Sequence, residues 1–330
     1  MTGKSSTLWE HYRSLLVDEM RRALPPSPTT SLHDAIRYHV GLEGLDGVES
    51  EPGGKMIRGS LTLAICGGLG GDEAQCVPAA LAVELVHRAS LVFDDIQDNG
   101  HLRNHRPTLY SLYGANRTIN IGLALSCYPR LALQPLGLGL MPRVDLVLEE
   151  ATIELCRGQD MDMSLAMDMD ARPPSTSRDG YLEMVRLKTG VLMGAAAQVG
   201  VIMAGGTPWP VPPGHPRIFG ENLGVMFQMQ DDLLGIWGDP QVSGKESSDL
   251  EEGKITLPVI MAMERGKDIL GLDPHEARAI LEDMAIPSFM KGIIMERYQE
   301  LLVQLSGLRL QEPHHQAIVQ LLQGMMVRES

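Results

Sequence analysis

Three carboxylates close an apolar stretch of the chain with the spacing D-D-x-x-D. The stretch covers residues 81–93 without a breaker, and Asp94, Asp95 and Asp98 follow it. On a helix, Asp94 and Asp98 lie one turn apart on one face, with Asp95 beside them. Clustered carboxylates repel one another unless a cation lies between them, and oxygen ligands suit hard ions. The spacing therefore predicts a Mg2+ site.

A second acidic pair, Asp231 and Asp232, closes another apolar segment, which covers residues 218–230. Gln228 precedes the pair by three residues and lies on roughly the same helical face as Asp231. Because an apolar helix leads into each acidic cluster, we expect one cavity with Mg2+ at its mouth and an apolar tube below. Such a cavity fits a substrate with an anionic head and an apolar tail.

The composition is typical of a globular protein with a full-sized core, since 44% of the 330 residues are hydrophobic and 21% are charged. Methionine is plentiful at 20 residues, and its flexible side chain suits an irregular apolar pocket as well as an ordinary core. The net charge of -14 argues against nucleic acid as a partner, because phosphate backbones require a basic patch. A phosphorylated small molecule stays compatible with this charge, since bound Mg2+ reverses the local sign.

The four cysteines, at positions 66, 76, 127 and 156, form neither a C-x-x-C pair nor a metal-like spacing. We therefore expect reduced, buried cysteines in a cytoplasmic protein. Residues 1–6 lead into a polar segment and do not resemble a signal peptide. The weakly polar run 190–206 is too short and too rich in glycine for a transmembrane span. The expectation is a soluble protein without a transmembrane segment.

The pattern of apolar residues predicts an all-α protein that folds as a single domain over residues 1–330. Runs of β-branched residues with a period of two are scarce, while apolar segments with helical spacing recur. Pro78 is expected to begin the long helix that ends at the first acidic cluster, and residues 135–142 are expected to form a loop. Further helices are expected over residues 7–23, 34–42, 144–163, 179–204 and 218–237.

The chain resembles the trans-isoprenyl diphosphate synthases, or polyprenyl synthetases, the family that includes farnesyl and geranylgeranyl diphosphate synthases. The resemblance extends from about residue 53 to residue 263, in the order and spacing of that family. A lone D-D-x-x-D is weak evidence, whereas two acidic centres with basic residues in register are strong evidence. The matching motifs are Gly53-Gly54-Lys55-x-x-Arg58, Glu84-Leu85-x-His87, Asp94-Asp95-x-x-Asp98, Arg103 with Pro107-Thr108, Gly158-Gln159, Lys188-Thr189-Gly190, Gln228-x-x-Asp231-Asp232, Gly244-Lys245 and Asp249-Leu250-x-x-Gly253-Lys254.

The resemblance implies an isoprenoid synthase-type helical bundle around a central apolar cavity, usually assembled as a homodimer. Three Mg2+ ions would bridge the carboxylates to the diphosphate of an allylic substrate, with Asp94, Asp98 and Asp231 as the main ligands and Asp95 and Asp232 beside them. The reaction implied is a prenyl transfer in isoprenoid biosynthesis, in which an allylic diphosphate ionises and the cation alkylates isopentenyl diphosphate.

The basic residues divide between the two substrates under the same resemblance. Those expected to reach the allylic diphosphate are Lys188, Lys245 and Lys254, with Arg103 and Gln228. Those expected to hold isopentenyl diphosphate, which binds without metal in this family, are Lys55, Arg58 and His87. Ammonium groups and divalent metals stabilise the departing negative charge most strongly in a water-poor site.

Small side chains before the first acidic cluster suggest the product length. Ala89 and Ser90 precede Asp94 by five and four residues, and Leu85 lies one further turn away. Helix rise places Ala89 ~7.5 Å below Asp94. Because small residues leave the tube open, we expect a product longer than C15 and predict C20.

Three positions depart from the family pattern: Asn104 replaces the second of two arginines, Leu123 replaces an acid, and Gly235 occupies the third acidic position of the second motif. Two alternatives to chain elongation therefore stay open. One is a terpene cyclase of the same fold, which ionises a prenyl diphosphate without isopentenyl diphosphate. The other is a non-catalytic partner subunit of a heteromeric synthase, although such subunits typically lack the acidic motifs.

Overall fold

A computed structural model of the chain describes residues 7–26, 31–167, 177–206, 215–238 and 249–326. Two compact units make up the chain. Unit 1 comprises residues 1–149, 195–211 and 309–318, and unit 2 comprises residues 150–194, 212–308 and 319–330. The boundaries pass through three helices, α7 (Gly137–Met167), α9 (Val191–Met203) and α15 (His314–Met326). The single domain expected over the whole chain stays a prediction.

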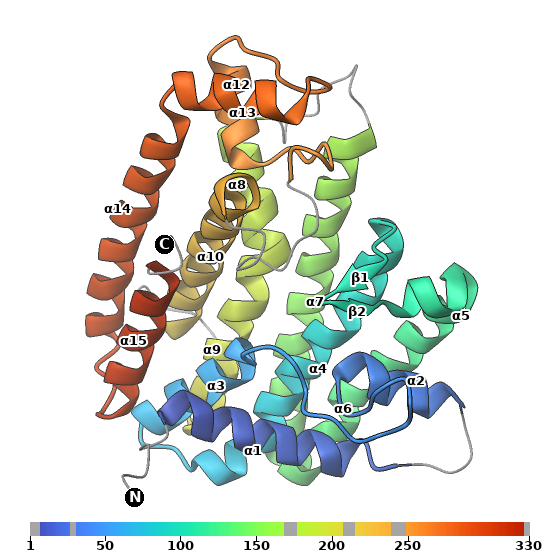
Figure 1. The fold of residues 1–330 in the computed structure, drawn as a ribbon. Coiled ribbons are helices and arrows are strands. Elements are labelled where there is room, and N and C mark those ends of the chain that lie inside the picture. The colour runs from blue at the N-terminus through green and yellow to red at the C-terminus, as the bar shows by residue number, and fades with distance from the viewer. Residues whose placement is uncertain (1–6, 27–30, 168–176, 207–214, 239–248, 327–330) are drawn as a thin grey trace, which may run out of the picture. The chain divides into compact units, whose positions relative to one another are not determined.

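Helices build unit 1, and one short hairpin interrupts them (Figure 1). The elements that lie wholly in this unit are α1 (Leu8–Ala23), α2 (Ser31–Val40), α3 (Ile57–Gly68), α4 (Glu73–Gln97), β1 (Leu102–Arg103), β2 (Arg106–Pro107), α5 (Leu109–Leu125), α6 (Tyr128–Ala132) and the 3-10 turn η1 (Gln134–Leu136). The first part of α7 (Gly137–Met167) and the end of α9 (Val191–Met203) complete the unit, with the start of α15 (His314–Met326).

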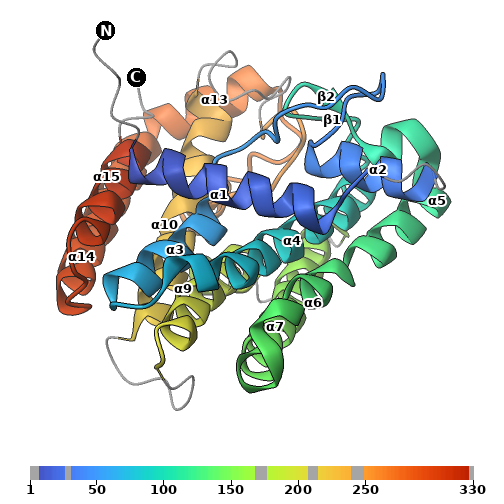
Figure 2. The same ribbon diagram turned by 90° about the horizontal axis from the view of Figure 1, so that it is seen from below.

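The central element of unit 1 is α4, which carries the first acidic cluster at its carboxyl end. Its interior side chains, such as Leu81, Leu85 and Val92, are fully buried. Helices α1, α3, α5 and α6 all pack against it, and Figure 2 shows α1 crossing α3 and α4. The approach of α3 is close because Gly59 has no side chain: a Cβ there would lie 2.9 Å from the backbone oxygen of Ala80.

The hairpin follows α4 and presents Arg103 to the acidic cluster. Strands β1 and β2 are antiparallel, with Arg103 opposite Arg106. Between them, Asn104 and His105 both adopt a left-handed backbone, with φ of 51° and 61°. Two left-handed residues in a two-residue loop match the twist of a hairpin, and asparagine tolerates this conformation better than most residues.

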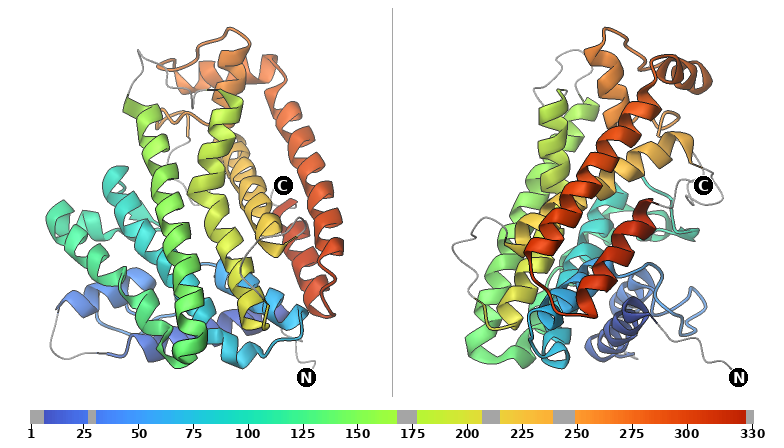
Figure 3. Two further views of the ribbon diagram at one scale, coloured as in Figure 1. Left: turned by 180° about the vertical axis from the view of Figure 1, so that it is seen from behind. Right: turned by 90° about the vertical axis from the view of Figure 1, so that its left-hand side faces the viewer.

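Unit 2 is also helical. Its elements are the rest of α7, α8 (Arg178–Val185), the π-helical turn η3 (Arg186–Gly190), the start of α9, α10 (Pro216–Trp237), α12 (Leu257–Glu264), α13 (Pro274–Asp283), α14 (Ile286–Gly307) and the end of α15. Helix α10 carries the second acidic pair and packs against η3 and α14. Figure 3 shows α12 and α13, drawn in orange, next to the start of α14.

The all-α prediction is confirmed, and two details of the elements were wrong. Pro78 lies inside α4, because Asp72 caps the helix earlier by accepting hydrogen bonds from the backbone N–H groups of Ala74 and Gln75. Residues 137–142 are also helical rather than a loop, with Pro142 inside α7.

The cysteines differ from expectation in part. All four are free, but Cys127 and Cys156 are exposed, whereas Cys66 and Cys76 are buried. Three helical segments of the described chain are long and apolar enough to cross a membrane by length and composition alone, at 73–97, 109–165 and 178–203. The first and third are mostly buried inside the protein. The expected absence of a transmembrane segment stays a prediction.

Candidate active site

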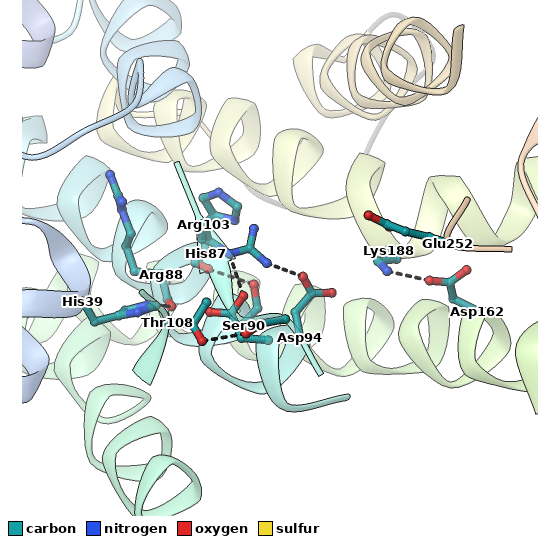
Figure 4. Close-up of polar contacts among 12 residues, drawn as sticks. His39, His87, Arg88, Ser90, Asp94, Arg103, Thr108, Asp162, Lys188 and Glu252 are labelled. Carbon is teal, nitrogen blue, oxygen red and sulfur yellow. Dashed lines mark hydrogen bonds and ion pairs between the residues drawn. The ribbon is translucent and has the colours of Figure 1, made fainter. Parts of the chain in front are cut away.

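The first acidic cluster lies at the carboxyl end of α4, where Arg103 binds two of its acids (Figure 4). The Arg103 Nη2 donates to Asp94 Oδ2 at 2.7 Å, and its Nε donates to Asp95 Oδ1 at 2.8 Å. Asp98 caps the helix, and its backbone N–H bonds to the backbone oxygen of Asp94 at 2.9 Å. The predicted proximity of Asp94, Asp95, Asp98 and Arg103 is therefore present within unit 1.

Burial and charge act in opposite directions at this cluster. Burial raises the pKa of Asp95, and the Arg103 guanidinium partly offsets that rise. Burial alone would lower the pKa of Arg103, but the carboxylates of Asp95 and Asp94 outweigh it and raise that pKa. The Asp95 side chain is only 4% exposed against 22% for Asp94, so Asp94 is the more accessible acid for an external cation.

The donor chemistry of the cluster fits Mg2+. Carboxylate oxygens are hard ligands, and Mg2+ is usually held by one or two carboxylates together with phosphate oxygens and water. Among the described residues, no three His, Cys, Asp or Glu side chains converge on one point. The cluster thus suits an ion that shares its coordination with a phosphorylated ligand better than an all-protein metal cage.

A second part of unit 1 is the glycine loop at residues 53–55, with Arg58 at the start of α3. Glu84 of α4 stabilises this start, because its Oε1 accepts from the backbone N–H of Gly59 at 2.8 Å. Met56 supplies no side-chain cap, so the Glu84 carboxylate satisfies a helix N-terminus that has none of its own. Lys55 is exposed in the loop and Arg58 is partly buried.

His87 lies on α4 in a cation-rich environment. Burial lowers its pKa well below the usual value, and the guanidinium groups of Arg58, Arg88 and Arg103 lower it further. The imidazole is therefore neutral at pH 7. Figure 4 shows Arg103 next to the His87 ring. A neutral imidazole surrounded by guanidinium groups can donate one N–H to an anion while the arginines supply the charge.

The small residues expected to set product length lie on the same helix. Ala89 is buried, and Leu85 is fully buried. The Ser90 hydroxyl donates to the backbone oxygen of His87 at 2.9 Å, so it is satisfied within its own helix. Neither Ala89 nor Ser90 places a bulky group beside α4, as the pocket-length prediction requires.

In unit 2 the second acidic pair divides into a buried and a more accessible carboxylate. Asp232 is 2% exposed and accepts three hydrogen bonds: from the Tyr181 hydroxyl, from Gln228 Nε2 at 3.0 Å and from the Leu257 backbone N–H at 3.1 Å. Burial raises its pKa to about 6, against those three hydrogen bonds. Asp231 is half-buried. The accessible Asp231 is thus the better candidate ligand, and Asp232 joins α8, α10 and α12.

Lys188 lies in the π-helical turn η3 of unit 2. Its Nζ forms an ion pair with Asp162 Oδ2 of α7 at 2.6 Å, which Figure 4 shows. Helix α7 comes close to this turn at Gly158, where a Cβ would lie 2.3 Å from the backbone nitrogen of Lys188. Widened turns of this kind often occur at functional sites. The glycine of the Gly158-Gln159 motif is explained by this close approach, because any side chain at 158 would collide with the backbone of η3.

Gly235 and Asp249 fit together in the same unit. A Cβ on Gly235 would lie 1.8 Å from Asp249 Oδ2, so the buried Asp249 carboxylate occupies the space of a side chain at 235. The Asp249 backbone N–H bonds to the Gly235 oxygen at 3.0 Å, and the Lys254 N–H bonds to the Asp249 oxygen at 2.9 Å. The Lys254 ammonium forms an ion pair with Glu252 at 2.5 Å. Lys245 lies outside the described residues.

Several contacts of the site residues were not predicted from the sequence. These involve Tyr181 and Leu257 at Asp232, Asp162 at Lys188, and Arg88 beside His87. Their partners are distant in the chain, and only Asp162 carried a local signal, because it follows Gly158 by one helical turn.

Comparison with known proteins adds a family. A sequence profile described as "Polyprenyl synthetase" matches residues 48–283. The (2E,6E)-farnesyl diphosphate synthase of Mycobacterium bovis is 35% identical over 241 residues, which are 71% of this chain and 64% of that protein. The geranylgeranyl diphosphate synthase of Methanosarcina mazei is 32% identical over 95% of this chain and 94% of that protein. The polyprenyl synthetase of Streptomyces coelicolor A3(2), a crystal structure, gives a TM-score of 0.83 at 28% identity, over 96% of this chain and 98% of that one.

The mycobacterial match covers less of the relative than of this chain. Only 64% of the farnesyl diphosphate synthase is aligned, while the Methanosarcina match covers nearly the whole length of both proteins. The aligned relatives bear different product names: farnesyl, geranylgeranyl and geranylfarnesyl diphosphate synthases. Similarity in sequence does not select one product length.

Proposed function

The chain belongs to the polyprenyl synthetase family, and from that premise we propose that it is a prenyltransferase. It condenses an allylic diphosphate with isopentenyl diphosphate into a longer all-trans prenyl diphosphate. The observation that carries the proposal is the combination on α4: an accessible acidic cluster at its carboxyl end, and His87 among three guanidinium groups two turns earlier. One helix thus offers ligands for a metal-bound diphosphate and for a second, metal-free diphosphate.

The carboxylates that would hold Mg2+ are Asp94 and Asp98 in unit 1 and Asp231 in unit 2. When bound, Mg2+ neutralises the diphosphate and makes it a better leaving group. Asp95 and Asp232 would support these ligands rather than replace them, because the Asp95 side chain is nearly buried and three donors bind Asp232. The same resemblance that names the ligands suggests three ions.

The basic residues of the chain stabilise the negative charge that develops on the departing diphosphate. The allylic C–O bond breaks, its electron pair goes to the diphosphate, and the alkene of isopentenyl diphosphate attacks the cation. The resulting cation then loses a proton to the departed diphosphate. Lys188, Lys254 and Arg103 each have a carboxylate partner, so a diphosphate exchanges one anion for another there. Apolar α4 residues exclude water, which would convert the cation to an alcohol.

The product is proposed to be C20. Ala89 and Ser90 are the small residues of α4 before the acidic cluster, and Leu85 lies a further turn away. A chain longer than C15 fits beside small residues, whereas a bulky residue at either position would block it.

The decisive experiment is a product analysis with purified protein, Mg2+ and isopentenyl diphosphate. Dimethylallyl, geranyl, farnesyl and geranylgeranyl diphosphate serve in turn as the allylic substrate, and products are analysed before and after phosphatase. Longer prenyl alcohols after phosphatase are the expected result. Their absence with every allylic substrate would refute chain elongation.

Two alternatives have their own outcomes in the same assay. Hydrocarbons formed without isopentenyl diphosphate would identify a terpene cyclase, which the loss of an arginine at Asn104 favours. No reaction with any substrate would favour the non-catalytic partner subunit, but both acidic motifs of this chain are present.

We also propose a cytoplasmic homodimer. Exposed apolar side chains gather on the elements of unit 1 from α5 to the start of α7, and a second copy of the chain would cover them. These residues are Ile119, Leu123, Leu131, Leu138 and Leu146. Leu123, which stands in place of an acid, is one of them, so an apolar contact is compatible with that departure.

A further inference from the structure

Arg88 lies on α4 directly after His87 and outside every motif that the chain shares with its family. Its Nη2 donates to the backbone oxygen of Gly53 at 2.9 Å, which brings the guanidinium to the glycine loop that precedes Lys55. The Nη2 atom also lies 3.7 Å from the place of a Cβ on Gly54. Figure 4 shows Arg88 leaving the helix on a different side from His87.

The charge of Arg88 is poorly balanced by its surroundings. Among the described residues, no carboxylate forms an ion pair with it, and its Nε is buried without a hydrogen-bond partner. Burial lowers the pKa of Arg88, which the Glu84 charge only partly opposes. Glu84 already accepts from the backbone of Gly59. Arg88 is half-buried, and its Nη2 bond to Gly53 is solvent-exposed, so the guanidinium can both be reached by an anion and gain from binding one.

The hairpin explains why a cation is needed on α4. The residue after Arg103 is Asn104, which is exposed and left-handed at φ 51°, so no second arginine stands there. Arg106 does not replace it, because its Nη2 donates to the Glu43 backbone oxygen at 2.8 Å and its guanidinium stacks 4.4 Å above the Tyr38 ring. Arg106, the other arginine of the hairpin, is thus already bound to the Glu43 backbone and the Tyr38 ring.

We propose that Arg88 is a further binding residue for the metal-free diphosphate, supplying from α4 the guanidinium that the hairpin lacks at position 104. The inference rests on the proposed function, because it assigns Arg88 to the site around Lys55, Arg58 and His87. The Gly53 contact holds the guanidinium beside the loop, and the remaining N–H groups donate to phosphate oxygens. Two N–H groups in one plane match two phosphate oxygens, which an ammonium group cannot do.

The test is a calorimetric titration of the full-length protein with inorganic diphosphate in EDTA, so that only metal-independent binding is measured. Arg88→Gln keeps an N–H donor for the Gly53 oxygen but removes the charge, and Arg88→Lys keeps the charge. Arg13→Gln is the matched control, because Arg13 supports the same loop through the Gly54 oxygen at 3.2 Å and the Pro52 oxygen at 2.5 Å. Circular dichroism melting verifies that each variant folds.

We expect Arg88→Gln to raise the Kd for diphosphate about tenfold or more, the effect of one charge-assisted hydrogen bond. Arg88→Lys should bind more tightly than Arg88→Gln. Arg13→Gln should stay within about twofold of the wild type by the same measure, since it removes a charge that supports the loop and pairs with Glu51 but lies outside the proposed site. Wild-type affinity in Arg88→Gln would overturn the proposal. Equal weakening in Arg13→Gln, or equal weakening in the two Arg88 variants, would also overturn it, because loop support or shape would then explain the loss.

Failure of this inference is separable from failure of the proposed function. Diphosphate binding in EDTA is measured without turnover, so a protein that elongates no substrate still tests Arg88. In an active enzyme, Arg88→Gln should raise KM for isopentenyl diphosphate and leave KM for the allylic substrate within about twofold, because only the former binds without metal. An equal rise in both KM values would contradict a role at the metal-free site.

Discussion

Neighbouring acids in this protein have different environments, and their environments predict different roles. Asp94 is reached by Arg103 through one oxygen and is the more exposed of the pair, whereas Asp95 is nearly buried. In unit 2, Asp231 is half-buried and Asp232 is fully enclosed by three donors. In each D-D pair, the first acid is the more exposed one, and the second is bound by the surrounding structure.

Substitution of the second acidic pair should therefore separate activity from stability. We expect Asp231→Asn to lower turnover by about a hundred- to a thousandfold, the loss typical of a group that stabilises transition-state charge, with little change in Tm. Asp232→Ala leaves the Tyr181 hydroxyl and the Leu257 N–H without their acceptor, and should lower the free energy of unfolding by about 3 kcal/mol. Steady-state kinetics and thermal melting of both variants measure this. A stable Asp232→Ala would contradict the anchoring role.

His39 should make unit 1 sensitive to acid. Burial lowers its pKa from 6.5 to about 4, with Arg88, Arg103 and Arg106 contributing, while its Nε2 lies 2.8 Å from the Arg88 backbone oxygen. A depressed histidine pKa means that the folded state favours the neutral ring. This stabilisation is complete above pH 6.5 and is lost as pH falls towards 4.

The variant His39→Gln keeps an N–H donor for the Arg88 oxygen but does not titrate. Relative to the wild type, its free energy of unfolding should fall less between pH 7 and pH 4, by at most about 3 kcal/mol. Denaturant unfolding across that pH range gives the two slopes. Parallel curves for the two proteins would show that His39 does not cause acid lability.

Residue types and spacing located the candidate side chains but did not show how those side chains are held. The spacing of Asp94, Asp98 and Arg103 was sufficient to place them together, because helix geometry and a short hairpin separate them by few residues. The contacts of Asp232 with Tyr181 and Leu257 join residues remote in the chain. No periodicity encodes such pairs, so a single sequence cannot supply them.

At the scale of elements, glycines explain close approaches that the motifs only mark. Gly158 allows α7 to approach the backbone of η3, and Gly235 makes room on α10 for the Asp249 carboxylate. The absence of an acid at 235 is therefore accompanied by an acid from another segment in the same space. Asp249 is itself part of the motif shared with the family, so Gly235 leaves room for that carboxylate.

Replacement of Gly235 should disturb Asp249 directly. In Gly235→Ala the new methyl group would lie 1.8 Å from Asp249 Oδ2, so the carboxylate must move. We expect at least about tenfold lower turnover and a loss of about 1–3 kcal/mol in the free energy of unfolding from the forced repacking. Gly292→Ala on α14 is the control, since nothing lies within 4 Å of its Cβ. A Gly235→Ala enzyme that behaves like this control would show that Asp249 adjusts freely.

Helix α4 should also determine product length through its small residues. Ala89→Phe or Ser90→Phe would put an aromatic ring ~7.5 Å or less below the acidic cluster, and each should shorten the product by at least one isoprene unit. Chromatography of the dephosphorylated alcohols measures the length, with melting curves as a check on folding. Unchanged product in both variants would remove this account of the pocket.

The start of α4 was predicted wrongly because two signals for a helix start, a capping aspartate and a proline, lie close together in the sequence. Pro78 was expected to begin α4, but Asp72 offers two hydrogen bonds to the helix start, so the helix begins earlier and includes the proline. The sequence did not predict the π-helical turn η3, which lies where α7 approaches closely at Gly158. The hairpin strands are two residues long, too short for any period of two.

At the scale of the whole molecule, each unit holds its own part of the candidate residues. Asp94, Asp98, Arg103 and the glycine loop belong to unit 1, and Asp231, Lys188 and Lys254 belong to unit 2. Each unit is assembled from segments that are not adjacent in the chain. Composition and helical periodicity could predict the fold class, but not this division.

The exposed apolar side chains of unit 1 lead to a prediction about assembly. Ile119 on α5 is 47% exposed and Leu131 on α6 is 51% exposed, in a unit whose other large apolar residues are mostly buried. If a second copy covers them, Ile119→Glu or Leu131→Glu places a charge in an apolar contact, which costs on the order of several kcal/mol, and the dimer should dissociate.

Sedimentation velocity over a range of protein concentrations distinguishes the two states. We expect a dimer for the wild type and a monomer for either variant at micromolar concentration. Val303→Glu is the matched control: Val303 is 74% exposed but lies on α14 of unit 2, outside the proposed contact, so its variant should remain dimeric. A wild type that sediments as a monomer would refute the dimer. Dissociation of all three variants would contradict the proposed contact, because a charge placed outside the apolar face of unit 1 would then dissociate the dimer as well.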